Sequence, residues 1–181
     1  LGSSPADATA DYGFAATPDL KRARLDAPFL LATIAPQALL AYRPGDDVGD
    51  LLTDTTLWYF PVMVDKSIRC LLVVDRTAAG WEAVSLGYVP LARALDGLLR
   101  ARAASNGARP RLVAVFQAQE YLYTVPGAAA PTLTPLAAPG SGLGGASAAA
   151  SPQTPAATTL LRLQPLVEQN LSAFGAPGNE P

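Results

Sequence analysis

The chain has 181 residues, of which 50% are hydrophobic and 15% are charged, and its formal net charge at pH 7 is −2. This length suits one domain of ordinary size, or a smaller domain with an attached tail. A near-neutral charge with scattered basic residues argues against nucleic acid as a partner. No apolar run approaches the roughly 18 residues that a spanning helix needs, so we expect no membrane span.

The N-terminal part of the chain changes character near Leu20. Residues 1–19 are small and polar without a sustained period, which predicts a loose leader. Residues 28–34 (PFLLATI) predict a buried strand, and Pro36 after it can open a one-turn helix. Residues 43–50 combine Pro, Gly and Asp, which is typical of a surface loop.

A three-stranded meander is expected next. Residues 57–64 and 68–74 are rich in aromatic and β-branched residues, and the Asp-Lys pair between them predicts a β-hairpin. Residues 81–86 add a third strand, whose simple alternation places Trp81, Ala83 and Ser85 on one face. Pro61 cannot donate a ladder hydrogen bond, so its strand is expected to be an edge strand or to be bulged there.

The second half of the domain contains the main predicted helix. Leu91, Leu95 and Leu98 recur with a helical period from Pro90 toward Asn106-Gly107. Residues 112–125 return to strand composition, and a polar step in the middle predicts two strands. This order predicts an α+β fold, with an antiparallel sheet of five to six strands and one main helix packed on one face.

The C-terminal third differs from the domain at 20–126. No charged residue occurs between positions 121 and 161, and residues 127–159 are dominated by Ala, Pro, Gly, Ser and Thr, which predicts a flexible linker. Residues 160–181 are expected to form a short helix and a tail. Pro165 suits the first position of that helix, and Gly175 suits its end.

Conventional catalytic and cofactor chemistry is missing from the sequence. There is no histidine and one cysteine, which removes Ser-His-Asp and Cys-His catalysis and a zinc site. Cys70 alternates with apolar neighbours, which predicts a buried, inert thiol. The match to a dinucleotide fingerprint at residues 140–145 (GSGLGG) lacks a preceding strand and a following helix, so we expect no cofactor.

Oxygen ligands for a cation gather in one loop, but their spacing is not that of an EF-hand. A solvated turn is therefore expected for this group of four carboxylates, which comprises Asp46, Asp47, Asp50 and Asp54.

Aromatic side chains concentrate on the predicted sheet, where they either pack in the core or form a platform for a partner. The C-terminal helix adds apolar anchors at helix-in-groove spacing. The candidate partner-binding residues are Trp58, Phe60, Trp81, Leu166, Leu171 and Phe174.

Three functional hypotheses remain open. The favoured one is a non-catalytic binding or protein-interaction module, with an unidentified protein partner and a tethered amphipathic C-terminal helix. The second is an enzyme that uses carboxylates alone, with Asp65, Asp75 or Glu82 as candidates. The third is a structural or assembly component that offers residues 57–64 for strand addition. A start at Leu1 fits a mature exported or envelope-associated protein and equally an artificial start.

Overall fold

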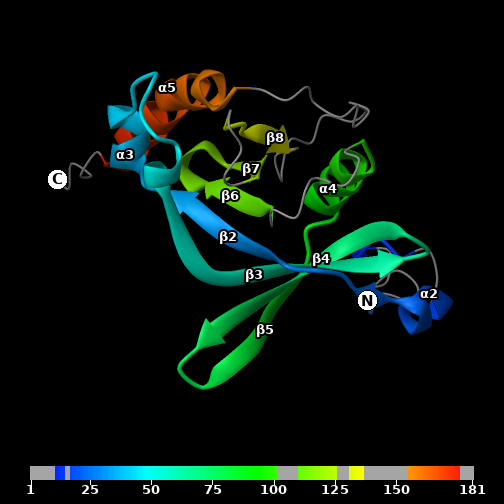
Figure 1. Ribbon diagram of the computed structural model, residues 1–181. Helices are drawn as coiled ribbons and strands as arrows, with labels where there is room; N and C mark the ends of the chain where they lie inside the picture. Colours follow the sequence, from blue (N-terminus) through cyan, green and yellow to red (C-terminus); the bar gives the residue numbers. More distant parts are fainter. Residues whose placement is uncertain (1–10, 15–16, 102–109, 126–130, 137–154, 176–181) are drawn as a thin grey trace.

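One mixed β-sheet organises the molecule, for which the computed structural model describes residues 11–14, 17–101, 110–125, 131–136 and 155–175 (Figure 1). Eight strands in these ranges form the sheet, in the order β5-β4-β3-β2-β6-β7-β8, with β1 paired beside β3. Strands β2 and β6 run parallel, whereas the other pairs are antiparallel. The α+β fold is as predicted, but the sheet has more strands than the five to six expected and contains one parallel pair where an antiparallel sheet was expected.

The strands are β1 (Arg24–Leu25), β2 (Phe29–Ile34), β3 (Leu52–Val64), β4 (Ser67–Thr77), β5 (Gly80–Gly87), β6 (Arg111–Val115), β7 (Glu120–Thr124) and β8 (Thr134–Leu136). The helices are α2 (Thr17–Arg22), α3 (Pro36–Ala41), α4 (Val89–Ala101) and α5 (Ala156–Gly175), and the 3-10 turns are η1 (Gly49–Leu51) and η2 (Phe116–Ala118).

The predicted hairpin between β3 and β4 is confirmed. Its two turn residues, Asp65 and Lys66, have φ angles of 50° and 68°. Such a left-handed pair gives the turn whose twist matches that of the flanking strands. Arg100 donates to the Lys66 carbonyl oxygen over 2.9 Å and Arg22 to the Asp65 carboxylate over 2.6 Å, so two helices brace the turn.

Strand β3 lies inside the sheet, so the expectation that Pro61 marks an edge is wrong. The alternative expectation was a bulge, and the register of β3 with β4 shifts between Val62 and Met63, one residue beyond Pro61. On one side β3 pairs with β4 along most of its length, and on the other it pairs with β2 and then with β1. Pro61 falls between those last two pairings, where its carbonyl oxygen accepts from the N–H of Asp26 over 3.0 Å. The missing N–H of proline therefore falls where the ladder is already interrupted.

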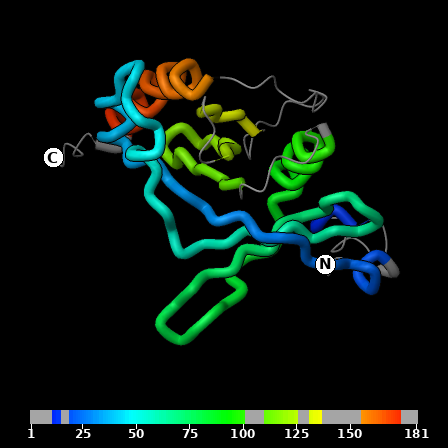
Figure 2. The backbone as a smooth tube through the Cα atoms, viewed as in Figure 1, coloured from blue at the N-terminus to red at the C-terminus, as the bar shows by residue number. Residues whose placement is uncertain are grey.

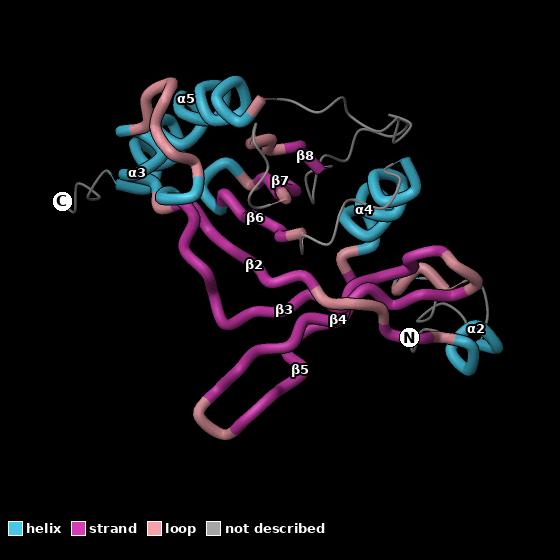
Figure 3. Tube along the Cα trace, viewed as in Figure 1, coloured by secondary structure: helices cyan, strands magenta, loops and turns pink. Residues whose placement is uncertain are grey.

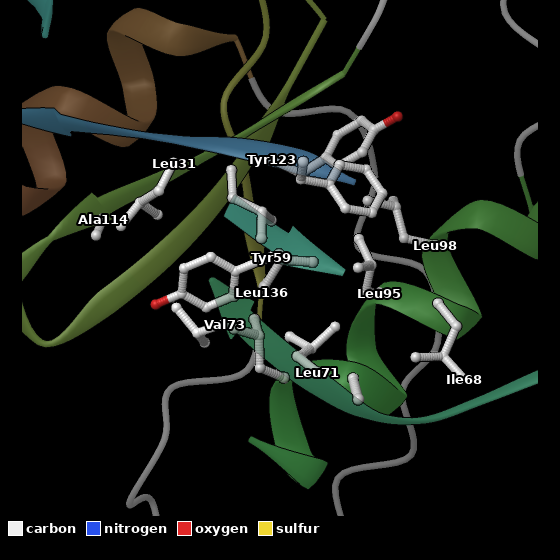
Figure 4. Close-up of a cluster of buried hydrophobic side chains, with 14 residues drawn as sticks. Leu31, Tyr59, Ile68, Leu71, Val73, Leu95, Leu98, Ala114, Tyr123 and Leu136 are labelled. Carbon is white, nitrogen blue, oxygen red and sulfur yellow. The ribbon is translucent and has the colours of Figure 1, made fainter. Parts of the chain in front are cut away.

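The predicted main helix, α4, covers one face of the sheet, which we call the inner face. Leu91, Leu95 and Leu98 are buried there against β4 and the centre of the sheet. Figure 4 shows Leu95 and Leu98 directed toward Tyr123 of β7 and Leu71 of β4. This face therefore has the apolar core predicted from the helical period, while the expected helix end at residues 106–107 lies outside the described residues.

The opposite face, the outer face, is covered over β2, β6 and β7 by α3 and α5, which lie side by side although far apart in the chain (Figure 2). Leu160, Leu163 and Val167 of α5 are fully buried in this second core. Gln164 donates to the carbonyl oxygen of Leu39 in α3 and to that of Tyr42, the residue just after α3, over 3.0 Å each. It thereby caps the end of α3. Helix α5 thus completes the outer core.

The expected linker and short helix need correction. Residues 134–136 of the predicted linker form β8, and Leu133 beside it is fully buried. Helix α5 begins at Ala156, where its N–H donates to the Pro131 carbonyl oxygen over 3.1 Å. The composition of residues 127–159 predicted a flexible linker, but a few apolar side chains in a charge-free stretch are enough to pack part of it on a sheet. Residues 127–130 and 137–154 lie outside the described part of the chain.

Pro165 stands inside α5 and does not open it. A proline in a helix removes the hydrogen bond to the carbonyl group four residues earlier. Here both Pro165 and Leu161 are on the exposed side of the helix, so water can reach that carbonyl group. The helix therefore continues through a residue that the sequence pattern assigned to its start.

The end of the predicted leader is part of the fold. Phe14 is only 4% exposed and packs with Val62, Val64 and Cys70 on the outer face. A Cβ atom added to Gly13, whose φ is +76°, would lie 2.7 Å from the Arg69 carbonyl oxygen. Only glycine permits this close approach without a shift, so the segment is fitted to the sheet.

Cys70 is fully buried, as predicted, and burial raises the pKa of its thiol to about 11 from 9.0. The folded state thus favours the neutral thiol, so this group's contribution to stability is present below pH 9 and is lost as the pH rises toward about 11. We expect no reaction with a thiol reagent at pH 8 until urea unfolds the chain. Between pH 8 and pH 10.5, the urea midpoint of unfolding should fall less for Cys70→Ala than for the wild type.

Candidate protein-binding surface

The β3-β4-β5 half of the outer face carries an aromatic patch that α3 and α5 do not cover. Residues paired across strands share a face, and the register pairs Trp58 with Val74 and both Phe60 and Leu86 with Leu72. The patch comprises Trp58, Phe60, Val74, Trp81 and Leu86. The three aromatic residues predicted as partner contacts on the sheet are therefore brought together on one face of adjacent strands.

A β-bulge in β5 sets which side chains join this patch. Val73 pairs with Ser85 and Val74 with Ala83, so Val84 is the extra residue. The bulge keeps Trp81 on the outer face with Leu86, and it puts Glu82 and Ser85 on the inner face. Simple alternation, which grouped Trp81 with Ser85, was therefore wrong beyond Val84.

Trp81 is the most exposed large apolar side chain of the patch, with 60% of its surface accessible. Its ring meets the ring of Trp58 edge to face, with centroids 6.3 Å apart and an interplanar angle of 72°. The Arg76 guanidinium carbon lies 5.7 Å from the centre of the Trp81 ring. Both neighbours restrict the indole, so this exposed aromatic side chain is held in place.

Strand β5 is a free edge. It pairs with β4 along one side, and no described strand pairs with its other side. The β4-β5 hairpin projects beyond the helices (Figure 3). The opposite edge, β8, is only three residues long and contains Pro135. Accordingly, β5 offers the long exposed edge that the sequence reading had assigned to residues 57–64.

Two carboxylates lie on the inner face of the same hairpin. Asp75 of β4 pairs directly with Glu82 of β5, and Leu57 of β3 flanks Asp75 on its other side. Atom Oδ1 of Asp75 is buried without a hydrogen-bond partner among the described residues. Asp65, the third carboxylate considered for catalysis, is separate and ion-paired with Arg22 at 2.6 Å.

Replacing Glu82 with glutamine should stabilise the isolated protein. Like charges directly opposite each other on paired strands cost roughly 0.2–1 kcal/mol. Glu82→Gln removes the repulsion from Asp75 and keeps the shape of the side chain, so we expect a gain within that range. Urea unfolding at low salt measures it, with Glu168→Gln on α5 as the control. An unchanged or lower midpoint for Glu82→Gln would mean that the two carboxylates do not repel.

No family model, curated protein or solved structure matches the chain. Its function must be argued from the surface chemistry, because a fold alone does not specify one.

Two other features of the described residues are the helices and the loop that carries the four carboxylates. No helix in the described ranges is long and apolar enough to cross a membrane. Asp46 and Asp47 accept hydrogen bonds from nearby backbone N–H groups at 2.7 Å, and Asp54 pairs with Arg111 at 2.8 Å. Three of the four carboxylates considered as cation ligands are thus engaged in ordinary loop and surface contacts.

A second candidate region surrounds Phe116, which is 55% exposed at the turn between β6 and β7. One hollow of about 260 Å³ is lined by residues that include Glu120 and Tyr121, and another of about 550 Å³ is lined by Asn170 and Leu171. Glu120 already accepts two hydrogen bonds from Arg162, at 2.7 and 2.6 Å. The hollows are therefore bordered by groups that hold α5 to the sheet.

The predicted contacts on the C-terminal helix are not gathered into one surface. Leu166 is 38% exposed, whereas Leu171 is partly buried against the outer core. Phe174 lies in the last turn of α5, and its side chain is outside the described residues. The fully buried anchors are Leu160, Leu163 and Val167. The prediction missed the first two because it began the helix nine residues too late, and it chose Leu166 where Val167 is the buried residue.

Proposed function

We propose that the chain is a non-catalytic protein-binding module whose partner adds a strand to the free edge of β5. The observation that carries this proposal is Trp81, a well-positioned and largely exposed aromatic side chain on an unpaired edge strand. Tryptophan and arginine dominate the energetics of protein interfaces, and Arg76 lies beside Trp81. Strand addition supplies main-chain hydrogen bonds, and side-chain contacts select the partner.

The composition of β5 supports the same proposal. Proteins protect an edge strand with lysine, proline, a β-bulge, an inward-facing charge or a covering element, because an open apolar edge invites unwanted pairing. Strand β5 contains neither lysine nor proline, and its exposed side chains include Trp81, Val84 and Leu86. The bulge at Val84 and the inner-face charge of Glu82 limit indiscriminate pairing, and a partner that covers this edge accounts for the apolar side chains that remain exposed.

A carboxylate enzyme is the weaker alternative. It would have to use Asp75 and Glu82, which lie on a projecting hairpin and line neither hollow near Phe116. Acid-base catalysis needs a substrate held within hydrogen-bond reach of the acid, and an exposed hairpin provides little to hold one. The aromatic patch therefore favours binding.

Affinity capture from source-cell extract tests the proposal. The baits are the wild-type chain, Trp81→Ala and the matched control Leu161→Ala, which removes a side chain that is 42% exposed on α5. We expect one set of proteins retained by the wild type and the control, with about tenfold or greater loss for Trp81→Ala. Equal retention by all three baits would contradict binding at β5.

A further inference from the structure

We infer that the strand received by β5 alternates lysine or arginine with apolar residues. The inference rests on the proposed binding at β5 and specifies the class of partner. Side chains of an added strand alternate between the two faces of the sheet. They would meet the aromatic patch on the outer face and the Asp75-Glu82 pair on the inner face.

The acidic inner side of the hairpin has no compensating cation from the part of the chain that the structure describes. No ion pair of Asp75 or Glu82 is formed within the described ranges, and one oxygen of Asp75 is buried without a partner. Arg76, the nearest basic residue along β4, pairs with Trp81 and shares its outer face. On the inner face Leu57 occupies the β3 side of the pair, so the open side is the free edge of β5.

An added strand would place a residue directly beside Glu82 on that open side. A lysine or arginine there is within reach of the carboxylates and relieves the repulsion between them. Its two apolar neighbours in the strand would lie beside Trp81 and Ala83, and the next apolar residue along would lie beside Leu86. Charge complementarity and apolar contact are therefore satisfied together by a strand with strict alternation.

A second copy of the chain fits this edge less well. One two-fold pairing that joins outer face to outer face would place Trp81 opposite the copy's Leu86 and Glu82 opposite the copy's Ser85. The apolar contacts would be good. Both carboxylate pairs would nevertheless remain without a cation, which favours a basic strand over self-association.

The two tryptophans of the chain, Trp58 and Trp81, both belong to the aromatic patch, so intrinsic fluorescence reports on it directly. Three capped ten-residue peptides serve as probes, alternating Lys-Val, Glu-Val and Thr-Val. We expect Lys-Val to shift the emission and to bind about tenfold or more tightly than Glu-Val, with an affinity that falls as salt is added. We expect Glu82→Gln to weaken Lys-Val binding about three- to fivefold and to leave Thr-Val binding unchanged. The control variant, Glu168→Gln, should leave the binding of both peptides unchanged.

The results distinguish a failure of the basic-strand inference from a failure of the proposed binding at β5. If Thr-Val and Glu-Val bind as tightly as Lys-Val, or if Glu82→Gln has no effect, the basic-strand inference is wrong while binding at β5 stands. If no peptide shifts the tryptophan emission, the basic-strand inference and the proposed strand addition at β5 are both wrong. Concentration-dependent dimerisation in sedimentation, with a tryptophan shift and no peptide present, would overturn the inference in favour of a second copy.

Discussion

Leu163→Ala is expected to lower the free energy of unfolding by about 2–5 kcal/mol, the cost of a cavity at a fully buried leucine. A domain of this size has a total stability of about 5–15 kcal/mol, so a large share of it should be lost. Leu163 packs against the outer core beneath α5, whereas Leu166, three residues later, is 38% exposed. Urea unfolding followed by circular dichroism measures the change.

Leu166→Ala is the control for that measurement and should change the unfolding free energy by no more than about 0.5 kcal/mol. A similarly small effect for Leu163→Ala would show that α5 does not dock on the sheet. The C-terminal helix would then be the free, tethered element that the sequence analysis expected.

Phe14→Ala should also be strongly destabilising, by about 3–5 kcal/mol. Its ring is 4% exposed and closes a cluster with Val62, Val64 and Cys70 at the end of the sheet. Tyr12→Ala, which removes a ring that is 40% exposed two residues earlier, is the matched control.

The urea midpoint distinguishes two accounts of the N-terminal segment. A large drop for Phe14→Ala with little change for Tyr12→Ala confirms that the segment belongs to the core. Equal, small effects for both variants would mean that the segment does not pack on the sheet, as expected of a leader.

Local sequence patterns predicted the elements that depend on residues close together in the chain. The hairpin at Asp65 and Lys66 follows from two strand-forming runs with a two-residue turn, and α4 follows from leucines at helical spacing. The α+β fold class follows from the order of these elements. Trp58, Phe60 and Trp81 could be assigned to the sheet, although their common face depends on register.

The remaining features depend on contacts between distant residues. The parallel pairing of β2 with β6 joins Leu31 to Leu112, and nothing in either strand specifies the other. The bulge at Val84 reverses the face of the residues beyond it, a shift that alternation cannot reveal. The sequence analysis named Asp75 and Glu82 as candidates for catalysis without assigning a register to their hairpin. The pair lies between the turn and the bulge, and that it stands at an open edge depends on the order of the strands in the sheet.

Stability and binding are expected to oppose each other at this edge. Glu82→Gln should make the isolated protein more stable and weaken its binding to a basic strand. The reason is that the repulsion between Asp75 and Glu82 destabilises the free protein and is relieved when a basic strand binds. A carboxylate pair with a purely structural role would not show this opposition. The combination of the two measurements is therefore more informative than either one.

The most direct test of the central claim is photo-crosslinking in source cells from chains that carry a photoreactive phenylalanine analogue at position 84 or at position 116. The first position is on the edge of β5, and the second is beside the hollows of the alternative region. Binding by strand addition predicts a discrete protein adduct from position 84 and none from position 116. An adduct from position 116 alone, or none from either position, would contradict it.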